Sequence, residues 1–458
     1  MKRWTRRALW QRVAILVQGL FAARLGSACA RVIEVERIIE KEVTKVVTEV
    51  VRETVIVERT SAPAIPAITL TPTVRGRVNV VADVLPYAWT RFAQLVSPAF
   101  EEMFPQTRLV WRVEGDWSSY PQRIAALSAS GQLGDLVEAP IGALLAEWAR
   151  RGIIRPLDDI IEADGFSPAG IFASALKACQ DQGRQVGLPF LANGGDNVLI
   201  YNRGLFTQSD VVLPAPTWTL DDLSQAAAAL TRDLIGDGRT DQFGYAVQGY
   251  LPSCLPLLEL FGASLIAPDG QRCAIEEAGG LACLRWLYEQ VRVRRVAPSP
   301  MPIDRGVTSM FLTGTLAMLR QSFARYVDLR RAAPAGLIVG ATPFVKHPVT
   351  GRLAASPLGM AYAISSRTPY PLESFQWIKF ISSSEMGVQM FLGGYADPGC
   401  RLTSWKDARV LESFPLCAQL ADAAAAAQPQ ALPWNLRLSE CYAAWDAAVT
   451  ALLRGESS

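Results

Sequence analysis

Apolar and polar positions follow two different periods between residues 77 and 455, and their alternation predicts an α/β protein. Short β-rich apolar runs predict strands at 77–84, 108–113 and 135–138. Amphipathic segments with helical spacing predict helices at 89–104, 120–130, 141–151, 220–230, 281–291, 307–311, 371–382, 385–392 and 438–453. Strands that alternate with helices imply a mostly parallel sheet with helices on both faces.

The first 28 residues have the pattern of an export signal. They contain six basic residues and no acidic one, and the apolar run at 13–23 is too short to span a bilayer. TRRAL at 5–9 resembles a twin-arginine signal. LGSAC at 25–29 is similar to a lipoprotein box, with Gly26 where a Leu or Val is usual. The pattern predicts a signal peptide over 1–28 and a lipid on Cys29; an uncleaved anchor or an ordinary signal peptide is the alternative.

The next segment, residues 31–58, alternates β-branched apolar residues with Glu, Lys and Arg. A heptad assignment places six apolar residues on one seam: Val32, Ile39, Val43, Val46, Val50 and Val57. This suits a stalk helix or short coiled coil, whereas the valine content favours strand; a charged spacer is the simplest interpretation. Residues 60–75 contain three prolines and predict a semi-rigid linker. We therefore expect the folded body to begin near Gly76.

Composition and charge narrow the function classes. The chain has 458 residues, half of them hydrophobic and 19% charged, which is globular composition sufficient for two to three domains. Removing the six leader residues from the 45 basic ones leaves 39 against 43 acidic residues, so the body shows no bias toward nucleic acid. Eight cysteines form no C-x-x-C motif. Cys273 with Cys283 is a possible disulfide, and buried free thiols are the alternative.

Six sequence blocks occur in the order found in maltose-binding-like extracellular solute-binding proteins of ABC importers, which the chain resembles. They are GDLV at 134–137, WARRGIIRPLDDII at 148–161, GLPFLANGGDNVLIYNRGLF at 187–206, WTLDDLSQAAAAL at 218–230, GTLAM at 314–318 and SFQWIKFISSSEMGVQMF at 374–391. The block at 187–206 is the most specific. The resemblance implies a periplasmic-binding-protein-like fold: two α/β lobes, each a mostly parallel sheet with flanking helices, and a hinge between them.

The resemblance also implies a division of the chain. Residues 29–75 would be lipid anchor, stalk and linker; 76–193 with 358–404 would form lobe 1; 194–357 with 405–458 would form lobe 2. Segments near 193–197 and 357–360 would cross between the lobes. Gly194 and Gly195 lie in the first crossing, where glycine tolerates the dihedral changes of a hinge.

The ligand site is expected beyond the carboxyl ends of the strands, as in other open α/β sheets. A sugar needs flat aromatic faces and polar side chains for its hydroxyls. The expected ligand-binding residues are Tyr87, Trp89, Trp117, Glu138, Asn193, Asp196, Asn197, Gln321, Phe323, Trp434 and Tyr442. The resemblance contributes Phe323, where the family often has Trp, and the aromatics Trp434 and Tyr442. For Trp89 and Phe323 core packing is the alternative, for Glu138 a helix cap, and for Asp196 a hinge role.

Catalytic and metal-binding patterns are weak. Asp233 and the segment GDGRTD at 236–241 partly resemble a calcium loop, but Ile235 replaces a ligand and no Glu closes it. His347 is the single histidine. A glycoside hydrolase would need two carboxylates placed around one bond, and no pair stands out. We therefore expect no enzyme activity, cofactor or metal.

The leader and the family resemblance together imply an extracytoplasmic receptor, anchored to the cell membrane by lipid, in the periplasm or on the outer face of the cytoplasmic membrane. Its expected partners are a sugar or oligosaccharide and the permease subunits of an ABC importer, with no nucleic acid. A receptor of the same fold for a polyamine, phosphorylated polyol or peptide is the alternative.

Overall fold

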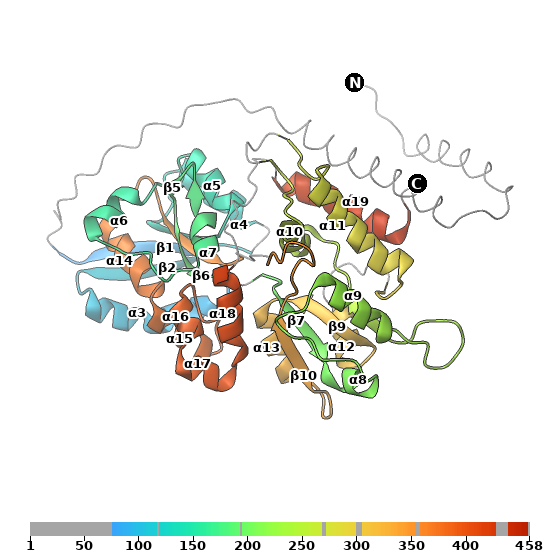
Figure 1. The fold of residues 1–458 in the computed structure, drawn as a ribbon. Helices are drawn as coiled ribbons and strands as arrows, with labels where there is room; N and C mark the ends of the chain where they lie inside the picture. Colours follow the sequence, from blue (N-terminus) through green and yellow to red (C-terminus); the bar gives the residue numbers. More distant parts are fainter. Residues whose placement is uncertain are drawn as a thin grey trace, which may run out of the picture.

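The computed structural model describes residues 76–116, 119–192, 195–267, 272–298, 305–353, 358–426 and 438–456. Within them two sheets, each with its own helices, form two lobes that lie side by side (Figure 1). The predicted signal peptide, Cys29, stalk and linker lie outside the described residues. So do Trp117, Asn193 and Trp434, together with the side chain of Tyr442.

Lobe 1 is built on a five-stranded sheet in the order β2-β1-β3-β11-β6. Its strands are β1 (Val78–Val84), β2 (Thr107–Val113), β3 (Leu136–Pro140), β6 (Leu188–Leu191) and β11 (Met360–Ile364). Its helices are α3 (Ala88–Met103), α4 (Tyr120–Ala129), α5 (Ala143–Arg150), α6 (Asp158–Asp164), α7 (Ala173–Ala178), α14 (Pro371–Ile381) and α15 (Ser384–Leu392). A small hairpin, β4 (Gln180–Asp181) with β5 (Arg184–Gln185), lies apart from the sheet.

Lobe 2 is built on a four-stranded sheet in the order β10-β7-β9-β8. Its strands are β7 (Val198–Asn202), β8 (Phe243–Ala246), β9 (Leu316–Gln321) and β10 (Val339–Pro343). Its helices are α8 (Arg203–Gln208), α9 (Leu220–Ala229), α10 (Leu251–Leu260), α11 (Ala278–Tyr288), α12 (Arg305–Leu312), α13 (Phe323–Ala332) and α19 (Leu438–Arg454), and a π-helical turn, η1 (Glu289–Val293), extends α11.

Both sheets are mixed, whereas the alternation of strands and helices along the chain predicted mostly parallel ones. In lobe 1, β1 runs parallel to β2 and β3, but β11 is antiparallel to both of its neighbours. In lobe 2 only β8 and β9 are parallel. The antiparallel strand β11 follows a crossing from the other lobe. Such a strand is not joined to its neighbour by the short helical crossover that enforces parallel pairing.

The segment after Ser404 also departs from the expected division. Its helices α16 (Leu402–Trp405) and α17 (Ala408–Ser413) stay with lobe 1, and α18 (Leu416–Ala426) lies between the lobes. α16 and α17 pack on α15, and α18 packs on α16 and α17 and against β10 of lobe 2. Of the helices described after Ser404, α19 alone joins the lobe 2 core, through Trp445, Val449 and Leu452.

Local sequence explains the helix positions. The predicted helix at 89–104 becomes α3, which turns Trp89, Phe92 and Phe100 into the core. α9 begins at a capping box in which Thr219 and Asp222 satisfy each other's backbone N–H groups.

The seven cysteines of the described chain are buried free thiols, so Cys273 and Cys283 are not bonded to each other.

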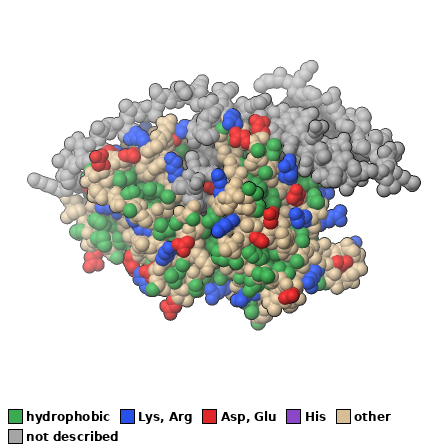
Figure 2. All heavy atoms as spheres, in the orientation of Figure 1, with side chains coloured by type: hydrophobic (Ala, Val, Ile, Leu, Met, Phe, Trp, Pro, Cys, Tyr) green, Lys and Arg blue, Asp and Glu red, His purple; other side chains and the backbone are tan. Residues whose placement is uncertain are grey.

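The described chain begins at the amino end of β1. Arg77 pairs with Glu101 of α3, and the Val78 amide donates to the Gln106 carbonyl at 2.7 Å. Among the described residues, no helix is long and apolar enough to cross a membrane. Acidic and basic side chains are mixed over the face drawn in Figure 2. The charges visible there do not form a single-sign surface.

Candidate ligand-binding site

The carboxyl ends of the strands in both lobes lie next to the segments that connect the lobes. In lobe 1 the parallel strands β1, β2 and β3 end at one edge of the sheet. In lobe 2, β9 ends at Gln321 beside Val198, where β7 begins. One crossing leads from β6 to β7 and the other from β10 to β11. Ligands of open α/β sheets bind at such edges, so we place the candidate site here.

A buried polar network forms the lobe 2 side of this site. The Ser253 hydroxyl donates to the carboxylate of Asp196, and it lies 3.2 Å from Oε1 of Gln248. Arg320 donates to the carbonyl of Ser253, and more weakly, at 3.5 Å, to the carbonyl of Asp196. The network thus joins the first crossing, α10 and β9. Because buried polar groups are costly unless they are hydrogen-bonded, these contacts fix one arrangement of the three segments.

Arg320 is the charged centre of the network, with 3% of its surface exposed. Its guanidinium lies 5.1 Å from the centre of the Phe344 ring, a cation–π contact with the second crossing. Burial raises the pKa of the neighbouring Tyr245 to about 12, although the charge and hydrogen bond of Arg320 oppose this shift. The phenol therefore remains a neutral hydrogen-bonding group at physiological pH.

The loop between β8 and α10 is held by α19, so the end of the chain helps to shape the site. The Trp445 indole donates to the Gly249 carbonyl at 3.0 Å, and the Leu251 amide donates to Asp446 at 2.7 Å. The second bond caps the first turn of α10, which has no side-chain cap of its own. Burial raises the pKa of Asp446, and the Leu251 amide partly offsets this effect.

On the lobe 1 side, Glu138 is fully buried within β3. Its Oε2 accepts a hydrogen bond from the Leu85 amide at 2.8 Å. The Tyr120 hydroxyl donates to the carbonyls of Asp83 and Glu138, at 2.9 and 2.8 Å. Burial raises the pKa of Glu138 well above its ordinary value, and the hydrogen bond from the Leu85 amide only partly lowers it. Glu138 joins β3 to the end of β1 rather than capping the following helix.

Two of the expected aromatic contacts lie in the core. Trp89 is 2% exposed, and its ring centre is 4.6 Å from that of Phe190 and 5.8 Å from that of Tyr362. Phe323 is 1% exposed, and its ring lies against Phe391, Trp405 and Phe414. Neither ring has a free face on which a sugar could stack. Core packing, the alternative raised for both residues, is what the structure shows.

Tyr87 differs from these two rings because it keeps 40% of its surface exposed. It precedes α3 directly and lies at the end of β1. Burial of the phenol and the nearby Glu138 charge raise its pKa to about 12. It is therefore a neutral aromatic group that remains accessible on the lobe 1 side.

The structure brings four of the expected polar positions to the crossings and strand ends. Asp196 belongs to the buried network, and Gln321 is the last residue of β9, with 4% of its surface exposed. The Asn197 carbonyl accepts a hydrogen bond from the Phe344 amide at 2.7 Å. Glu138 lies at the matching edge of lobe 1. Whether these residues touch ligand stays a prediction, as do Trp117, Asn193, Trp434 and Tyr442.

Three residues that sequence reasoning missed belong to the lobe 2 side: Gln248, Tyr250 and Ser253. All follow β8, a four-residue strand that was not predicted. The signal was present in the apolar run YAV at 245–247, which is followed directly by polar and aromatic residues.

The loop at 233–241 has its carboxylates occupied by backbone groups. Asp233 accepts from the Gly236 and Gly238 amides at 2.6 and 2.7 Å, and these bonds lower its pKa. Asp241 accepts from Leu234 at 2.7 Å. Within the described ranges, no group of three or more His, Cys, Asp or Glu residues is arranged to hold a metal ion. The Gly-rich turn is the interpretation that fits this geometry.

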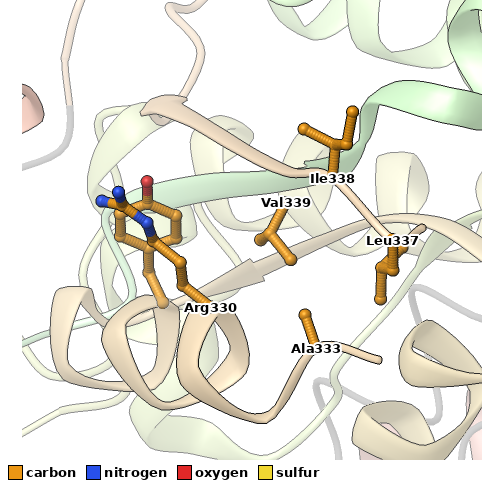
Figure 3. A pocket seen from close by; sticks show the side chains of 6 residues that line it. Arg330, Ala333, Leu337, Ile338 and Val339 are labelled. Atoms are coloured by element: carbon orange, nitrogen blue, oxygen red, sulfur yellow. The ribbon is translucent and has the colours of Figure 1, made fainter. Parts of the chain in front are cut away.

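A surface pocket of about 420 Å³ lies elsewhere in lobe 2, between α13 and the start of β10. Figure 3 shows Arg330 on one side of it and Leu337, Ile338 and Val339 on the other. It is at the opposite end of β10 from the crossing, which begins after Pro343. This pocket is therefore separate from the candidate site.

Two lobes of mixed sheet, joined by crossings beside a buried polar network, define a two-lobed ligand-binding protein. The family model of the bacterial extracellular solute-binding proteins matches residues 89–388. The chain belongs to this family. No curated protein sequence matches it.

Three solved structures illustrate the proteins whose fold is similar to that of this chain. The sugar-binding protein MalE from Xanthomonas citri is 17% identical with a TM-score of 0.70, over 83% of this chain and 93% of that one. An ABC substrate-binding protein from Listeria monocytogenes in complex with cycloalternan is 19% identical with a TM-score of 0.63, over 83% and 95%. UgpB from Mycobacterium tuberculosis in complex with glycerophosphocholine is 16% identical with a TM-score of 0.65, over 83% and 93%.

Proposed function

We propose that this protein is the substrate-binding receptor of an ABC importer and that it captures a sugar or oligosaccharide between its lobes. The observation that carries the proposal is the hydrogen-bonded network of Asp196, Ser253 and Arg320 at the carboxyl edge of lobe 2. Such an edge, lined by amide, hydroxyl and carboxylate groups and by Tyr87 on the facing lobe, suits a ligand rich in hydroxyls. Family membership and relatives bound to cycloalternan and maltotetraose support it.

The lobes would close on the ligand by bending at the two crossings. A ligand that contacts both lobes binds the closed form better and shifts the equilibrium toward it. The closed, loaded form would then be recognised by the permease. Since the receptor carries its solute unchanged, we infer no catalytic role.

A thermal-shift screen tests the ligand class. Maltose, maltotriose, maltotetraose, glycerophosphocholine and putrescine would be added separately, because a ligand that binds only the folded state raises the melting temperature. We expect a shift with at least one of the sugars, and a smaller radius of gyration by X-ray scattering at saturation. A shift with glycerophosphocholine alone would move the assignment to phosphorylated polyols. Shifts with none of the sugars would refute the sugar proposal.

We further propose that the protein is exported and held at the membrane by a lipid on Cys29. The support is the basic and apolar leader followed by small residues before that cysteine. Cys29→Ser should release the protein into the soluble fraction after cell breakage. If the variant stays with the membranes as firmly as the wild type, the anchor is not on Cys29.

A further inference from the structure

The two cores contain seven cysteines, and no disulfide joins any of them in the part of the chain that the structure describes. Each keeps at most 3% of its surface exposed. They are Cys179, Cys254, Cys273, Cys283, Cys400, Cys417 and Cys441. The native fold therefore uses all seven as reduced thiols, packed as small apolar side chains. Compartments outside the cytoplasm oxidise thiols, so this use of cysteine is unusual for an exported chain.

The folded protein protects these thiols from oxidation. Burial raises the pKa of Cys254 and Cys400 to about 12, so almost no thiolate is present near neutral pH. Disulfide exchange proceeds through the thiolate and removes two electrons and two protons from each pair of thiols, so the folded chain resists it. An unfolded chain has no such protection, because its thiols are exposed and have ordinary pKa values.

The order of the cysteines along the chain makes oxidation before folding harmful. Cys179 follows α7 in lobe 1, whereas the next cysteine, Cys254, lies in α10 of lobe 2. The chain is back in lobe 1 at Cys400, which follows α15, and joins lobe 2 again at Cys441 in α19. A chain that crossed the membrane unfolded would expose Cys179 and Cys254 first. A disulfide between them would tie together residues from two separate core clusters and block the native fold.

The leader offers a route that avoids this problem. TRRAL at 5–9 resembles a twin-arginine signal, and such signals direct chains to a translocase that moves folded proteins. Arg24 directly follows the apolar run at 13–23, at the end that a threading route has to move across the membrane. Basic residues at that end oppose threading, because Lys and Arg are preferentially retained on the cytoplasmic side. Both features of the leader favour export after folding.

We propose that this protein folds in the reducing cytoplasm and crosses the membrane already folded, with the twin-arginine translocase as its partner; this rests on the export described under the proposed function. Folding first buries the seven thiols before they meet an oxidising compartment. The receptor then reaches the outer face of the membrane with all seven reduced.

Arg6→Lys, Arg7→Lys is the double variant that tests the route. It keeps every positive charge of the leader, so a route that needs only a basic segment and an apolar run is unaffected. In a bacterium that has both export routes and an oxidising periplasm, the wild type should be exported and shortened. The double variant should stay in the cytoplasm at full length. Cell fractionation and the mass of the intact chain measure this, and export of the double variant to the wild-type extent would overturn the proposal.

Arg3→Lys, Arg12→Lys is the matched control. It makes the same two exchanges in the leader but leaves Arg6 and Arg7 in place. This variant should be exported as the wild type is. If it stayed in the cytoplasm as completely as the first double variant, any exchange of arginine in the leader would block export and the twin-arginine assignment would be wrong.

The state of the thiols tests the physical reason for the route. In the exported wild type, a maleimide reagent added without prior reduction should label the seven cysteines of the body only after denaturation. Replacing residues 1–28 by a general secretory lipoprotein signal should lower the yield of folded protein and give disulfide-linked peptides, including Cys179 with Cys254, by mass spectrometry. An equal yield of folded, fully reduced protein by that route would overturn the proposal.

Fractionation of the wild type separates this proposal from the proposed function. If the wild type is exported and the variant without the arginine pair is exported equally well, the folded route is wrong and the exported receptor stands. If the wild type stays in the cytoplasm, the proposed export itself is wrong, and the folded route with it. None of these measurements depends on which ligand the receptor binds.

Discussion

Glu138 is a carboxyl group without exposed surface, joined to the Leu85 amide. Since burial raises its pKa well above 4.5, the folded protein holds the proton more tightly than the unfolded chain does. The contribution of Glu138 to stability is therefore complete below its ordinary pKa and is lost as the pH rises through the folded-state pKa.

Glu138→Gln should make stability less dependent on pH. Glutamine is neutral at every pH and can still accept the bond from Leu85. We expect the variant to match the wild type near pH 5 and to melt about 3 °C higher near pH 8.5. Thermal unfolding at both pH values measures this. A wild-type advantage that grows with pH would show that the carboxyl is ionised in the folded protein.

Asp196 connects the first crossing to α10, since its carboxylate accepts a hydrogen bond from the Ser253 hydroxyl. Asp196→Ala leaves that hydroxyl without its carboxylate acceptor, while the Asp196 carbonyl that Arg320 contacts is retained. Losing a buried hydrogen-bond partner costs about 1–3 kcal/mol, so we expect both a lower melting temperature and weaker binding of the sugar found in the screen, by about ten- to a hundredfold. Ser253→Ala should weaken binding less. Normal affinity in a folded Asp196→Ala protein would remove Asp196 from the site.

Residue types alone did not reveal which aromatics face a ligand. Phe323 and Trp89 have the composition and chain position expected of stacking residues, yet both are core residues. Their partners, such as Phe414 and Tyr362, lie far along the chain, so the local sequence around Phe323 and Trp89 could not predict these contacts. By contrast, the family resemblance placed Asp196 at the first crossing, and in the structure Asp196 lies between β6 and β7.

At the scale of elements, the two crossings touch through a glycine. A Cβ added at Gly359 would lie 2.1 Å from the Leu191 carbonyl oxygen. Two non-bonded atoms cannot approach this closely, so any side chain at position 359 would push the backbone at Leu191 away. The neighbouring β11 shifts register against β6 between Met360 and Ala361. Gly359 is required here for close approach of two chain segments and not for an unusual dihedral angle.

Gly359→Ala should therefore force the crossings apart. We expect a loss of about 1–3 kcal/mol of stability, as in other overpacked cores, together with altered ligand affinity. Chemical denaturation measures the first effect. Gly204→Ala is the control, because the nearest atom to its Cβ is a side-chain oxygen at 3.2 Å. Equal stability of the two variants would mean that the crossings tolerate separation.

The predicted helices were largely correct, and helical periodicity explains why. The expected segments at 120–130, 220–230 and 385–392 correspond to α4, α9 and α15 to within one or two residues. Their apolar spacing is a local property. The placement of α16 and α17 on lobe 1, and of α18 between the lobes, was missed, because their packing on α15 and β10 is set by tertiary contacts and not by any local pattern.

At the scale of the whole molecule, the chain reaches the body from the side away from the site. β1 begins at Val78 and runs seven residues to the edge where the candidate site lies. Arg77 is the first residue with a partner in the described chain, through its ion pair with Glu101. A tether attached at this end would leave the carboxyl edges of both sheets free for ligand.

We predict that a chain beginning at Gly76 folds and binds as the full-length protein does. Both core clusters consist of residues from Val78 onward, so the shortened chain retains every side chain of the two cores. Its melting temperature should lie within about 2 °C of that of the longer chain, with the same affinity for the sugar found in the screen. A chain beginning at Leu85, which lacks the sheet strand between β2 and β3, should fail to fold. If the Gly76 chain also failed to fold, or bound more weakly, residues 1–75 would have to contribute contacts to the body, and their role as a spacer would be wrong.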